Sequence, residues 1–174
     1  MAIRKIREVG DEVLEKQCKK VDKMTIRTKI LIQDMLDTMY DAMGVGLAAP
    51  QVGILKQIVT IDVGEGPIVL INPEIIESDG TQTGEEGCLS LPGIHETVKR
   101  GDKIRVKYMD ENFVEHEEEV EGYLARVMQH EFDHLDGKMF IDHISPLRKQ
   151  MIKGKLNTML KGKARSSYKM KQVK

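Results

Sequence analysis

The sequence predicts an α+β fold in a single domain, in which antiparallel or mixed β-sheets pack around a central helix, with further helices near the N-terminus and the C-terminus. Two observations indicate this class. Three segments with helical periodicity are separated by strand-like runs that do not alternate regularly with them, as they would in a doubly wound fold. The chain has 174 residues, of which 40% are hydrophobic, and this suffices for one domain core.

The first helix is predicted from about Thr25 to Met43. Its apolar residues recur at the spacing of a helix that packs on a core: Ile32, Met35, Leu36, Met39, Tyr40 and Met43. Thr25 or Thr28 can cap its start, and Gly44 follows its last turn. The next segment, 44–53, is rich in glycine and other small residues, so we expect no regular element to run through all of it.

Four strands are predicted after this segment, because runs rich in β-branched and apolar residues are bounded there by turn-forming residues. They extend from Gln57 to Val63, from Ile68 to Asn72, from Lys103 to Met109 and from Phe113 to Val120. The last two are joined by the turn at 110–112, and we expect them to form a hairpin with an acidic outer face.

Two further helices are predicted in the C-terminal third of the chain. One runs from Gly122 to about Asp136 and is ended by Gly137, and its apolar side consists of Leu124, Val127, Met128 and Leu135. The Ser145-Pro146 pair then provides a cap and a first helical position for a basic amphipathic helix. We expect the chain to fray from about Ser166 onward.

Charge is unevenly distributed along the chain. Ten of the 27 basic residues and none of the 28 acidic residues follow Asp142, so an acidic body carries a basic tail. Such a tail suggests contact with a polyanion, and the alternative is a solvated, lysine-rich helix face. Aromatic residues make up 4% of the chain, with no Trp, which argues against a stacking platform for single-stranded nucleic acid. We expect no DNA partner.

No apolar run approaches the roughly 20 residues that span a bilayer, and the first residues lack the apolar core of a secretion signal. We therefore expect no membrane partner and a cytoplasmic location. The two cysteines, Cys18 and Cys88, cannot build a disulfide framework, which agrees with a reducing compartment. Cys18 has no assigned role, whereas Cys88 lies beside Gly87 in a stretch that resembles an edge segment.

The pattern that carries chemistry is HEFDH at 130–134, in the predicted central helix. His130 and His134 are four residues apart, so they lie one turn apart on one helix face and can share a metal ion. Glu131 lies beside this face, where a general base for a metal-bound water belongs. Burying two imidazoles in an apolar helix is costly unless they are paired or ligated. The pattern therefore predicts a metal centre on this helix.

The third ligand has to come from upstream. One metalloprotease group places a third histidine where this chain has Phe140, and another uses a later glutamate, which is missing after the motif here. Cys88 is the favoured candidate, because a thiolate, two imidazoles and an open position form a catalytic site that suits Zn or Fe(II). His95 and His116 are the alternatives, in more polar surroundings.

Three stretches resemble, in order and spacing, the signature motifs of the peptide deformylase family. They are GVGLAAPQ at 44–51, EGCLS at 86–90 and QHEFDHLDG at 129–137. The resemblance extends over nearly the whole chain, from 10–14 to 145–147. It implies hydrolysis of the N-formyl group from the formyl-methionine of nascent polypeptides, with release of formate. It also implies a catalytic part, 1–147, and a basic C-terminal helix and tail, 148–174, within the same domain.

The resemblance assigns roles to residues at matching motif positions. The metal ligands are Cys88, His130 and His134. The family's usual ion is Fe(II), which Zn or Ni can replace. Metal-bound hydroxide attacks the formyl carbon, and Glu131 is the general acid and base. The Gln51 side-chain amide and the Leu89 backbone N–H are the oxyanion donors.

Substrate contacts are expected at two places. The strand edge that pairs with the peptide backbone comprises Val45, Gly46 and Leu47. The apolar pocket for the methionine side chain is expected near the metal helix, with Val127 as its lining residue and Tyr123 and Arg126 as further candidates. Glu86 and Arg100 match a charged pair that supports the cysteine loop in relatives. His95 stands where several relatives have arginine, which leaves contacts to the outer part of the peptide open.

Two other functions share some of these features. A zinc endopeptidase would have the same metal helix, but the missing downstream ligand and the presence of Gln51 argue against it. A metal-binding or ribosome-associated protein without catalysis would not need the intact Glu131. The basic tail suggests the ribosome as a partner, through the phosphates of ribosomal RNA.

Overall fold

The computed structural model describes residues 2–161 and has the predicted α+β architecture. The α-helices are α1 (Ile26–Asp41), α2 (Gly122–Leu135) and α3 (Pro146–Leu160). The strands are β1 (Gly46–Ala48), β2 (Ile58–Ile61), β3 (Ile68–Asp79), β4 (Gln82–Cys88), β5 (Leu91–Arg100), β6 (Lys103–Met109) and β7 (Glu115–Glu121). Short 3-10 helices occur at Glu12–Glu15, Ala49–Val52 and Phe140–His143.

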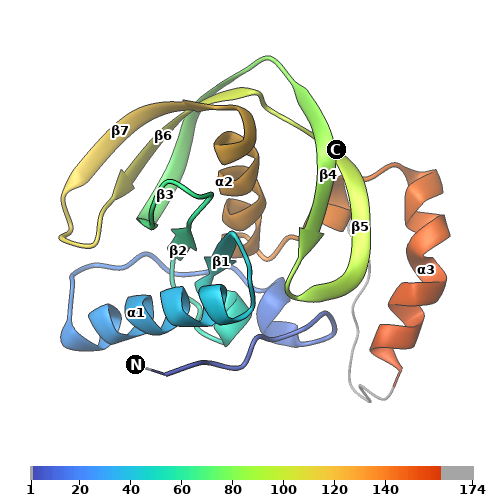
Figure 1. Cartoon of the computed structure of the whole chain (residues 1–174), viewed down its shortest axis with the longest axis horizontal. Helices are drawn as coiled ribbons and strands as arrows, with labels where there is room; N and C mark the ends of the chain where they lie inside the picture. Colours follow the sequence, from blue (N-terminus) through green and yellow to red (C-terminus); the bar gives the residue numbers. More distant parts are fainter. Residues whose placement is uncertain (1, 162–174) are drawn as a thin grey trace.

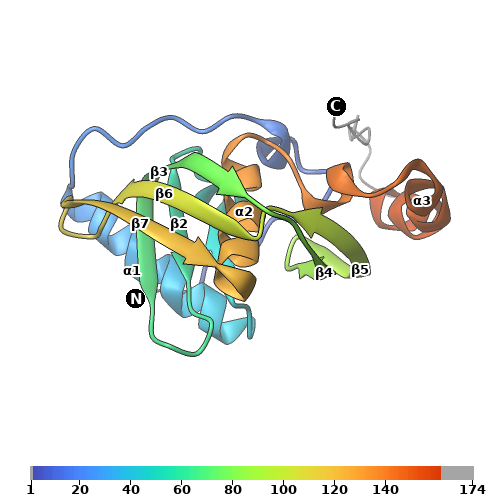
Figure 2. The same cartoon turned by 90° about the horizontal axis from the view of Figure 1, so that it is seen from above.

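The strands form two antiparallel sheets, and α2 lies between them (Figure 1, Figure 2). One sheet has five strands in the order β1-β2-β3-β6-β7, and the other is the β4-β5 pair. In the larger sheet Ile61 faces Gly46 on β1 and Ile68 on β3. The chain therefore places a short edge strand, β1, directly beside the central helix.

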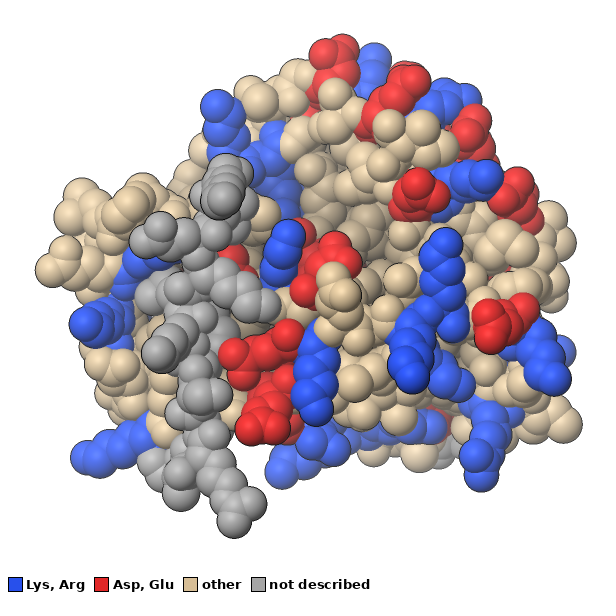
Figure 3. Space-filling view, turned by 180° about the vertical axis from the view of Figure 1, so that it is seen from behind, with Lys and Arg blue, Asp and Glu red and all other residues tan. Residues whose placement is uncertain are grey.

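The predicted hairpin is the β6-β7 pair, in which Tyr108 faces His116. Its outer surface carries a ladder of opposite charges: Lys103 with Glu119 and Glu121, Arg105 with Glu117, and Lys107 with Glu115. Acidic and basic side chains accordingly intermingle over this hairpin in Figure 3. Charges along β7, an edge strand, also discourage pairing with strands of other molecules.

β2 and the first residues of β3 are buried on both faces because α1 and α2 cover opposite sides of the sheet there. In β3, Leu70 belongs to the core cluster of α2, whereas Val69 and Ile71 belong to the cluster of α1. The alternation follows from the period of two along a strand. It explains why this part of the sequence is continuously apolar instead of alternating with polar residues.

The helix ends use the expected capping residues. Thr25 caps α1 by accepting a hydrogen bond from the Thr28 N–H, and Ser145 caps α3 with Pro146 at its first position. Gly137 follows α2 with a φ of 72°, and a β-carbon there would lie 2.5 Å from the Glu15 carbonyl oxygen. Glycine is therefore required by both the turn and the close approach.

The structure differs from the predicted elements around the second sheet. β3 continues to Asp79 instead of ending near Asn72, and β4 and β5 form where no strand was predicted. β5 lacks the alternation of apolar and polar residues that would have predicted a strand. Its inward-facing positions include the charged residues Glu96 and Arg100 beside Ile94 and Val98. Each of these charges has an ionic partner, Glu86 for Arg100 and Arg148 for Glu96, so the inward side of the strand is not apolar in sequence.

α3 belongs to the folded core through one face. Ile152 and Leu156 are buried in a cluster with β5, and Arg148 binds both carboxylate oxygens of Glu96 at 2.8 and 2.9 Å. The predicted fraying from Ser166 lies outside the described residues. Within residues 2–161, no helix has both the length and the hydrophobicity needed to cross a membrane.

Candidate metal centre

The structure brings Cys88, His130 and His134 together at one point. Cys88 ends β4, and both histidines lie on α2, one turn apart. One ligand atom from each of the three residues lies within 4.8 Å of the others, and Cys88 Sγ is 3.3 Å from His134 Nε2. Ligands placed 2.0–2.3 Å from a common ion would be separated by up to about 4 Å. The donor set and its spacing therefore fit one transition-metal ion.

The hydrogen bonding of His130 leaves the ring nitrogen that faces the cluster available to bind an ion. His130 Nδ1 is bonded to Glu86 Oε1 at 2.8 Å, so its Nε2 is directed into the cluster. Both imidazoles are buried, at 7% and 0% exposure. His134 Nδ1 is buried without a hydrogen-bond partner among the described residues. Buried imidazoles next to a sulfur are typical of a ligand site and not of a solvated helix face.

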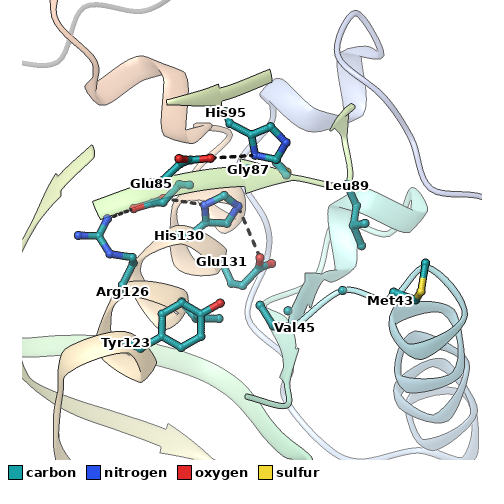
Figure 4. A pocket seen from close by; sticks show the side chains of 15 residues that line it. Met43, Val45, Glu85, Gly87, Leu89, His95, Tyr123, Arg126, His130 and Glu131 are labelled. Atoms are coloured by element: carbon teal, nitrogen blue, oxygen red, sulfur yellow. Dashed lines mark hydrogen bonds and ion pairs between the residues drawn. The ribbon is translucent and has the colours of Figure 1, made fainter. Parts of the chain in front are cut away.

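The other two histidines considered as ligands lie elsewhere. His116 stacks on Tyr108 on the β6-β7 hairpin and binds Asp110 through Nε2 at 2.6 Å. His95 projects from β5 at the rim of a pocket beside the cluster (Figure 4), with its Nδ1 3.8 Å from the Glu85 carboxylate. Neither belongs to the cluster that can hold an ion among the described residues.

Electrostatics favour a thiolate at Cys88. Burial would raise the pKa of the thiol, but the charge of His134 and hydrogen bonds from both imidazoles outweigh it and lower the pKa to about 5. The same attraction outweighs burial at His130 and His134 and raises the pKa of each imidazole. Without an ion, the cluster therefore favours a thiolate next to imidazoles that hold their protons more tightly than usual. An incoming cation has to displace any such proton from the nitrogen that it binds.

Glu131 is buried beside the cluster, with Oε1 3.7 Å from His130 Nε2. Burial raises the pKa of its carboxyl to about 7, although the two imidazole charges act in the opposite direction. Its Oε2 is buried with no hydrogen-bond partner among the described residues. A carboxyl group that titrates near neutrality can both accept and return a proton.

Gly46 of β1 makes room for this carboxylate. A β-carbon at Gly46 would lie 2.9 Å from Glu131 Cγ and 3.0 Å from Oε1, closer than side chains normally approach. The glycine therefore lets the edge strand approach the Glu131 carboxylate directly.

Gln51 is held with its amide nitrogen toward the cluster. Its Oε1 accepts a hydrogen bond from the Ala48 N–H at 2.9 Å, which orients the side chain. Its Nε2 donates to Ser90 Oγ at 3.0 Å and lies 3.5 Å from Cys88 Sγ. Leu89 follows Cys88 directly, and both residues line a pocket beside the cluster. Both predicted oxyanion donors are thus placed next to the candidate ligands.

Glu86 is the centre of a buried ionic network around His130. Its two oxygens accept hydrogen bonds from Arg100 at 2.8 Å each, and Oε2 also accepts one from Arg126 at 2.6 Å. Burial would raise the pKa of Glu86, but hydrogen bonds from Arg100 and His130 and their charges lower it to about 2. The predicted Glu86–Arg100 pair is therefore present and holds the ring of a candidate ligand.

Sequence reasoning missed the continuation of this network. Asp133 Oδ2 accepts hydrogen bonds from Arg100 at 2.8 Å and pairs with His143 Nε2 at 2.7 Å. It also missed the role of Arg126, whose Nη1 donates to the carbonyl groups of Gly84 and Val98 and so fastens both strands of the β4-β5 pair to α2. The position of Asp133 inside the HEFDH motif was the one sequence feature that could have predicted its place beside the candidate ligands.

A pocket of about 350 Å³ opens beside the cluster (Figure 4). His130 and Glu131 lie at its centre, Glu85 and His95 at one side, and Val45 and Met43 at another. The predicted substrate residues Val45, Gly46 and Val127 line it, together with Tyr123 and Arg126. Leu47 differs, because its side chain is fully buried in the core cluster under α1 and only its backbone belongs to the edge strand.

Comparison with known proteins gives one consistent family. The family model described as polypeptide deformylase matches residues 3–150. A peptide deformylase of Agathobacter rectalis is 58% identical over 144 residues, covering 83% of this chain and 91% of the relative, and peptide deformylase 1 of Clostridium perfringens is 56% identical, covering 82% and 99%.

Solved structures agree with this result. The crystal structure of a peptide deformylase from Legionella pneumophila has a TM-score of 0.86 at 46% identity and covers 94% of this chain and 99% of its own. The peptide deformylase from Thermotoga maritima has a TM-score of 0.82 at 51% identity, covering 84% and 100%. With a family model that matches most of its length and relatives above 50% identity, this chain belongs to the polypeptide deformylase family, which is a family of enzymes.

Proposed function

We propose that the protein hydrolyses the N-formyl group of formyl-methionyl nascent peptides and releases formate. The observation that carries this proposal is the cluster of three candidate metal ligands, with a buried carboxyl group of pKa about 7 and an oriented amide donor beside it. Cys88, His130 and Glu131 of this group line one pocket. Relatives at 52–58% identity are named peptide deformylase, which supports the same activity.

One divalent ion is assigned to Cys88, His130 and His134. When bound, it supplies Lewis-acid chemistry, because it lowers the pKa of a coordinated water and polarises the formyl oxygen. We propose Fe(II) as the ion in the cell, with Zn or Ni as replacements, since a thiolate with two imidazoles suits all three.

Glu131 moves the proton in the proposed reaction. Its carboxylate accepts a proton from the attacking water as the oxygen adds to the formyl carbon. It then delivers that proton to the leaving nitrogen as the C–N bond breaks, so that formate and a free amine result. A pKa of about 7 suits both halves of this cycle at neutral pH.

The Gln51 amide and the Leu89 N–H are assigned to the oxygen that gains charge during the addition. The Ala48 N–H fixes the Gln51 oxygen, so the amide nitrogen needs no reorientation when charge develops. Removal of one donor of this kind typically costs 10²- to 10³-fold in rate.

The peptide is proposed to lie along the outer edge of β1. β1 pairs with β2 on one side only, and its other side borders the pocket. An extended peptide can add to such an edge through backbone hydrogen bonds. The methionine side chain then enters the pocket toward Val127, which lies one turn before the motif on α2.

Formate release from formyl-Met-Ala-Ser by protein purified anaerobically and loaded with Fe(II) tests this function directly. We expect turnover with wild-type protein and none with Glu131→Ala, which should still bind the ion because it keeps all three ligands. An unformylated peptide with internal bonds, assayed in parallel, should remain intact. Cleavage of internal bonds without formate release would instead identify an endopeptidase, and absence of both would refute the proposal.

We also propose that α3 contacts the ribosome in the cytoplasm through its exposed lysines. Lys153 and Lys155 are exposed and flank the buried face of Ile152 and Leu156, one on each side, whereas Arg148 is already engaged by Glu96. Charge reversal at Lys153 and Lys155 should reduce the amount of protein that co-sediments with 70S ribosomes, and the remaining binding should depend less on salt concentration. Hydrolysis of short formyl peptides should continue. Truncation from residue 148 is unsuitable as a test because it removes buried core residues. Unchanged ribosome binding by the reversed variant would contradict the proposal.

A further inference from the structure

Met43 combines an unusual backbone conformation with an exposed apolar side chain. It follows the last turn of α1 with a φ of 56°, in the left-handed region that glycine and asparagine favour at a helix end. Its N–H donates to the Tyr40 carbonyl, and the next N–H, of Gly44, donates to the Met39 carbonyl. The helix end therefore fixes the backbone, yet Met43 is 91% exposed and buries almost none of its side chain.

The other non-glycine residues with positive φ in the described chain, Asn72 and Phe113, are held by contacts of their side chains. Asn72 exchanges two hydrogen bonds of 2.8 Å with the backbone of Val21. Phe113 packs against the core cluster under α1. Met43 is 91% exposed, so burial of its side chain among the described residues does not offset the cost of this conformation. Conformations of this kind concentrate at functional sites.

Met43 lies at the outer rim of the pocket beside the metal centre. Figure 4 shows its side chain on the same side of the pocket as Val45 and Leu89, across from Glu85 and His95. Val45 is 40% exposed. One rim of the pocket is therefore apolar and accessible, whereas the facing rim is polar.

The position along the chain indicates which part of a peptide meets this apolar rim. Gly46 lies against Glu131, so the reacting end of a substrate belongs there. Met43 is three residues farther from that end, a distance of at most about 10 Å along the chain. A peptide extended along this edge reaches Met43 with its second or third residue, beyond the methionine whose side chain enters the pocket.

We propose that Met43 is a specificity-determining residue that binds an apolar side chain at the second or third position of the formyl peptide. The inference rests on the proposed deformylase function and adds to it a preference for apolar residues after the formyl-methionine. Burial of the exposed thioether chain against such a residue provides the attraction. Because the contact is equal in the bound substrate and the transition state, we expect it to act on KM rather than on kcat.

The test compares kcat/KM for formyl-Met-Leu-Leu with that for formyl-Met-Ser-Ser. Partial burial of a methionine side chain is worth about a tenfold preference for the apolar peptide in the wild-type protein. Met43→Asn should reduce this ratio to about twofold, chiefly through a higher KM for the apolar peptide. Met43→Leu keeps an apolar side chain and should retain the preference.

Two controls make the result specific. Ile26→Asn removes an exposed apolar side chain at the opposite end of α1 and should leave the ratio unchanged. Asparagine tolerates the left-handed conformation, so Met43→Asn should not lower the melting temperature. An equal ratio in wild-type protein and Met43→Asn, or an equal loss in Ile26→Asn, overturns the inference. Absence of formate release from both peptides by the wild-type protein refutes the proposed function itself.

Discussion

Cys88 shows how one residue couples the metal centre to pH. Its pKa of about 5 favours the thiolate at neutral pH, and the raised pKa values of His130 and His134 favour protons on the imidazoles when no ion is bound. A metal ion must displace those protons, because only a neutral imidazole is a ligand.

We therefore expect the affinity of the metal-free protein for Zn to rise with pH, because protons compete with the ion for both imidazoles and the raised pKa values strengthen this competition. Below about pH 5 a further proton competes for the Cys88 sulfur. Titration with Zn against a competing chelator at a series of pH values measures the effect. An affinity that is independent of pH would show that the imidazoles are already neutral before the ion binds.

Gly46 lies so close to Glu131 that one added methyl group is expected to disturb the position of the carboxylate. Gly46→Ala places a β-carbon 2.9 Å from Glu131 Cγ and displaces the carboxylate. We expect a loss of about 100-fold in kcat/KM for formyl peptides, because a shift of about 1 Å in a catalytic group has that cost. Zn affinity should change little, since no ligand is touched.

The matched control is Gly154→Ala in α3, where a β-carbon meets nothing within 4 Å. In a helix interior this change should stabilise the protein by about 0.5–1 kcal/mol without effect on activity. Chemical denaturation and formate release measure both variants. Equal activity of the two variants would contradict the assigned contact between Gly46 and Glu131.

At the scale of elements, local patterns predicted the helices and the apolar strands. The caps of α1 and α3 and the spacing on α2 are local signals, and the structure confirms each. β5 could not be found in this way, because its inward positions Glu96 and Arg100 are charged and only the tertiary structure supplies their partners. The candidate site was predictable where chemistry and sequence spacing coincide, as at His130 and His134.

The part of the site that sequence reasoning missed depends on the same strand. The link from Arg100 to Asp133 crosses from β5 to α2, and no periodicity in the chain encodes it. Cys88 was predicted as a ligand from its residue type, from the neighbouring Gly87 and from its place in the EGCLS motif. The Glu86 network exists because β4 and β5 pack on α2, and this packing is a tertiary contact that no local sequence pattern predicts.

The pairing of β5 with α3 leads to a prediction about the C-terminal helix. Arg148→Met leaves the buried Glu96 carboxylate without its partner, so we expect a lower melting temperature and earlier proteolysis within α3. Combining it with Glu96→Leu removes the unpaired charge and should restore much of the loss. A double-mutant cycle by thermal unfolding measures the coupling. Additive effects of the two changes would exclude this ion pair as an anchor of α3.

At the scale of the whole molecule, Glu86 joins the smaller sheet to the central helix. It lies on β4, accepts hydrogen bonds from Arg100 of β5 and Arg126 of α2, and holds the ring of His130. Its pKa of about 2 in the folded protein, against 4.5 as the reference value, makes this junction sensitive to acid. Because the folded-state value is lowered, its contribution is complete above about pH 4.5 and disappears as the pH falls through 2.

The metal-free protein should therefore lose about 3 kcal/mol of unfolding free energy between pH 4.5 and 2 through this group alone. Glu86→Gln removes the titration and leaves Arg100 and Arg126 without their carboxylate, so the variant should be less stable at pH 7 but lose less stability on acidification. Urea unfolding at pH 5, 4, 3 and 2.5 compares the two proteins, and the other buried carboxylates cancel in the difference. Parallel curves for the two proteins would show that the ordering of the β4-β5 pair on α2 depends on contacts other than this carboxylate.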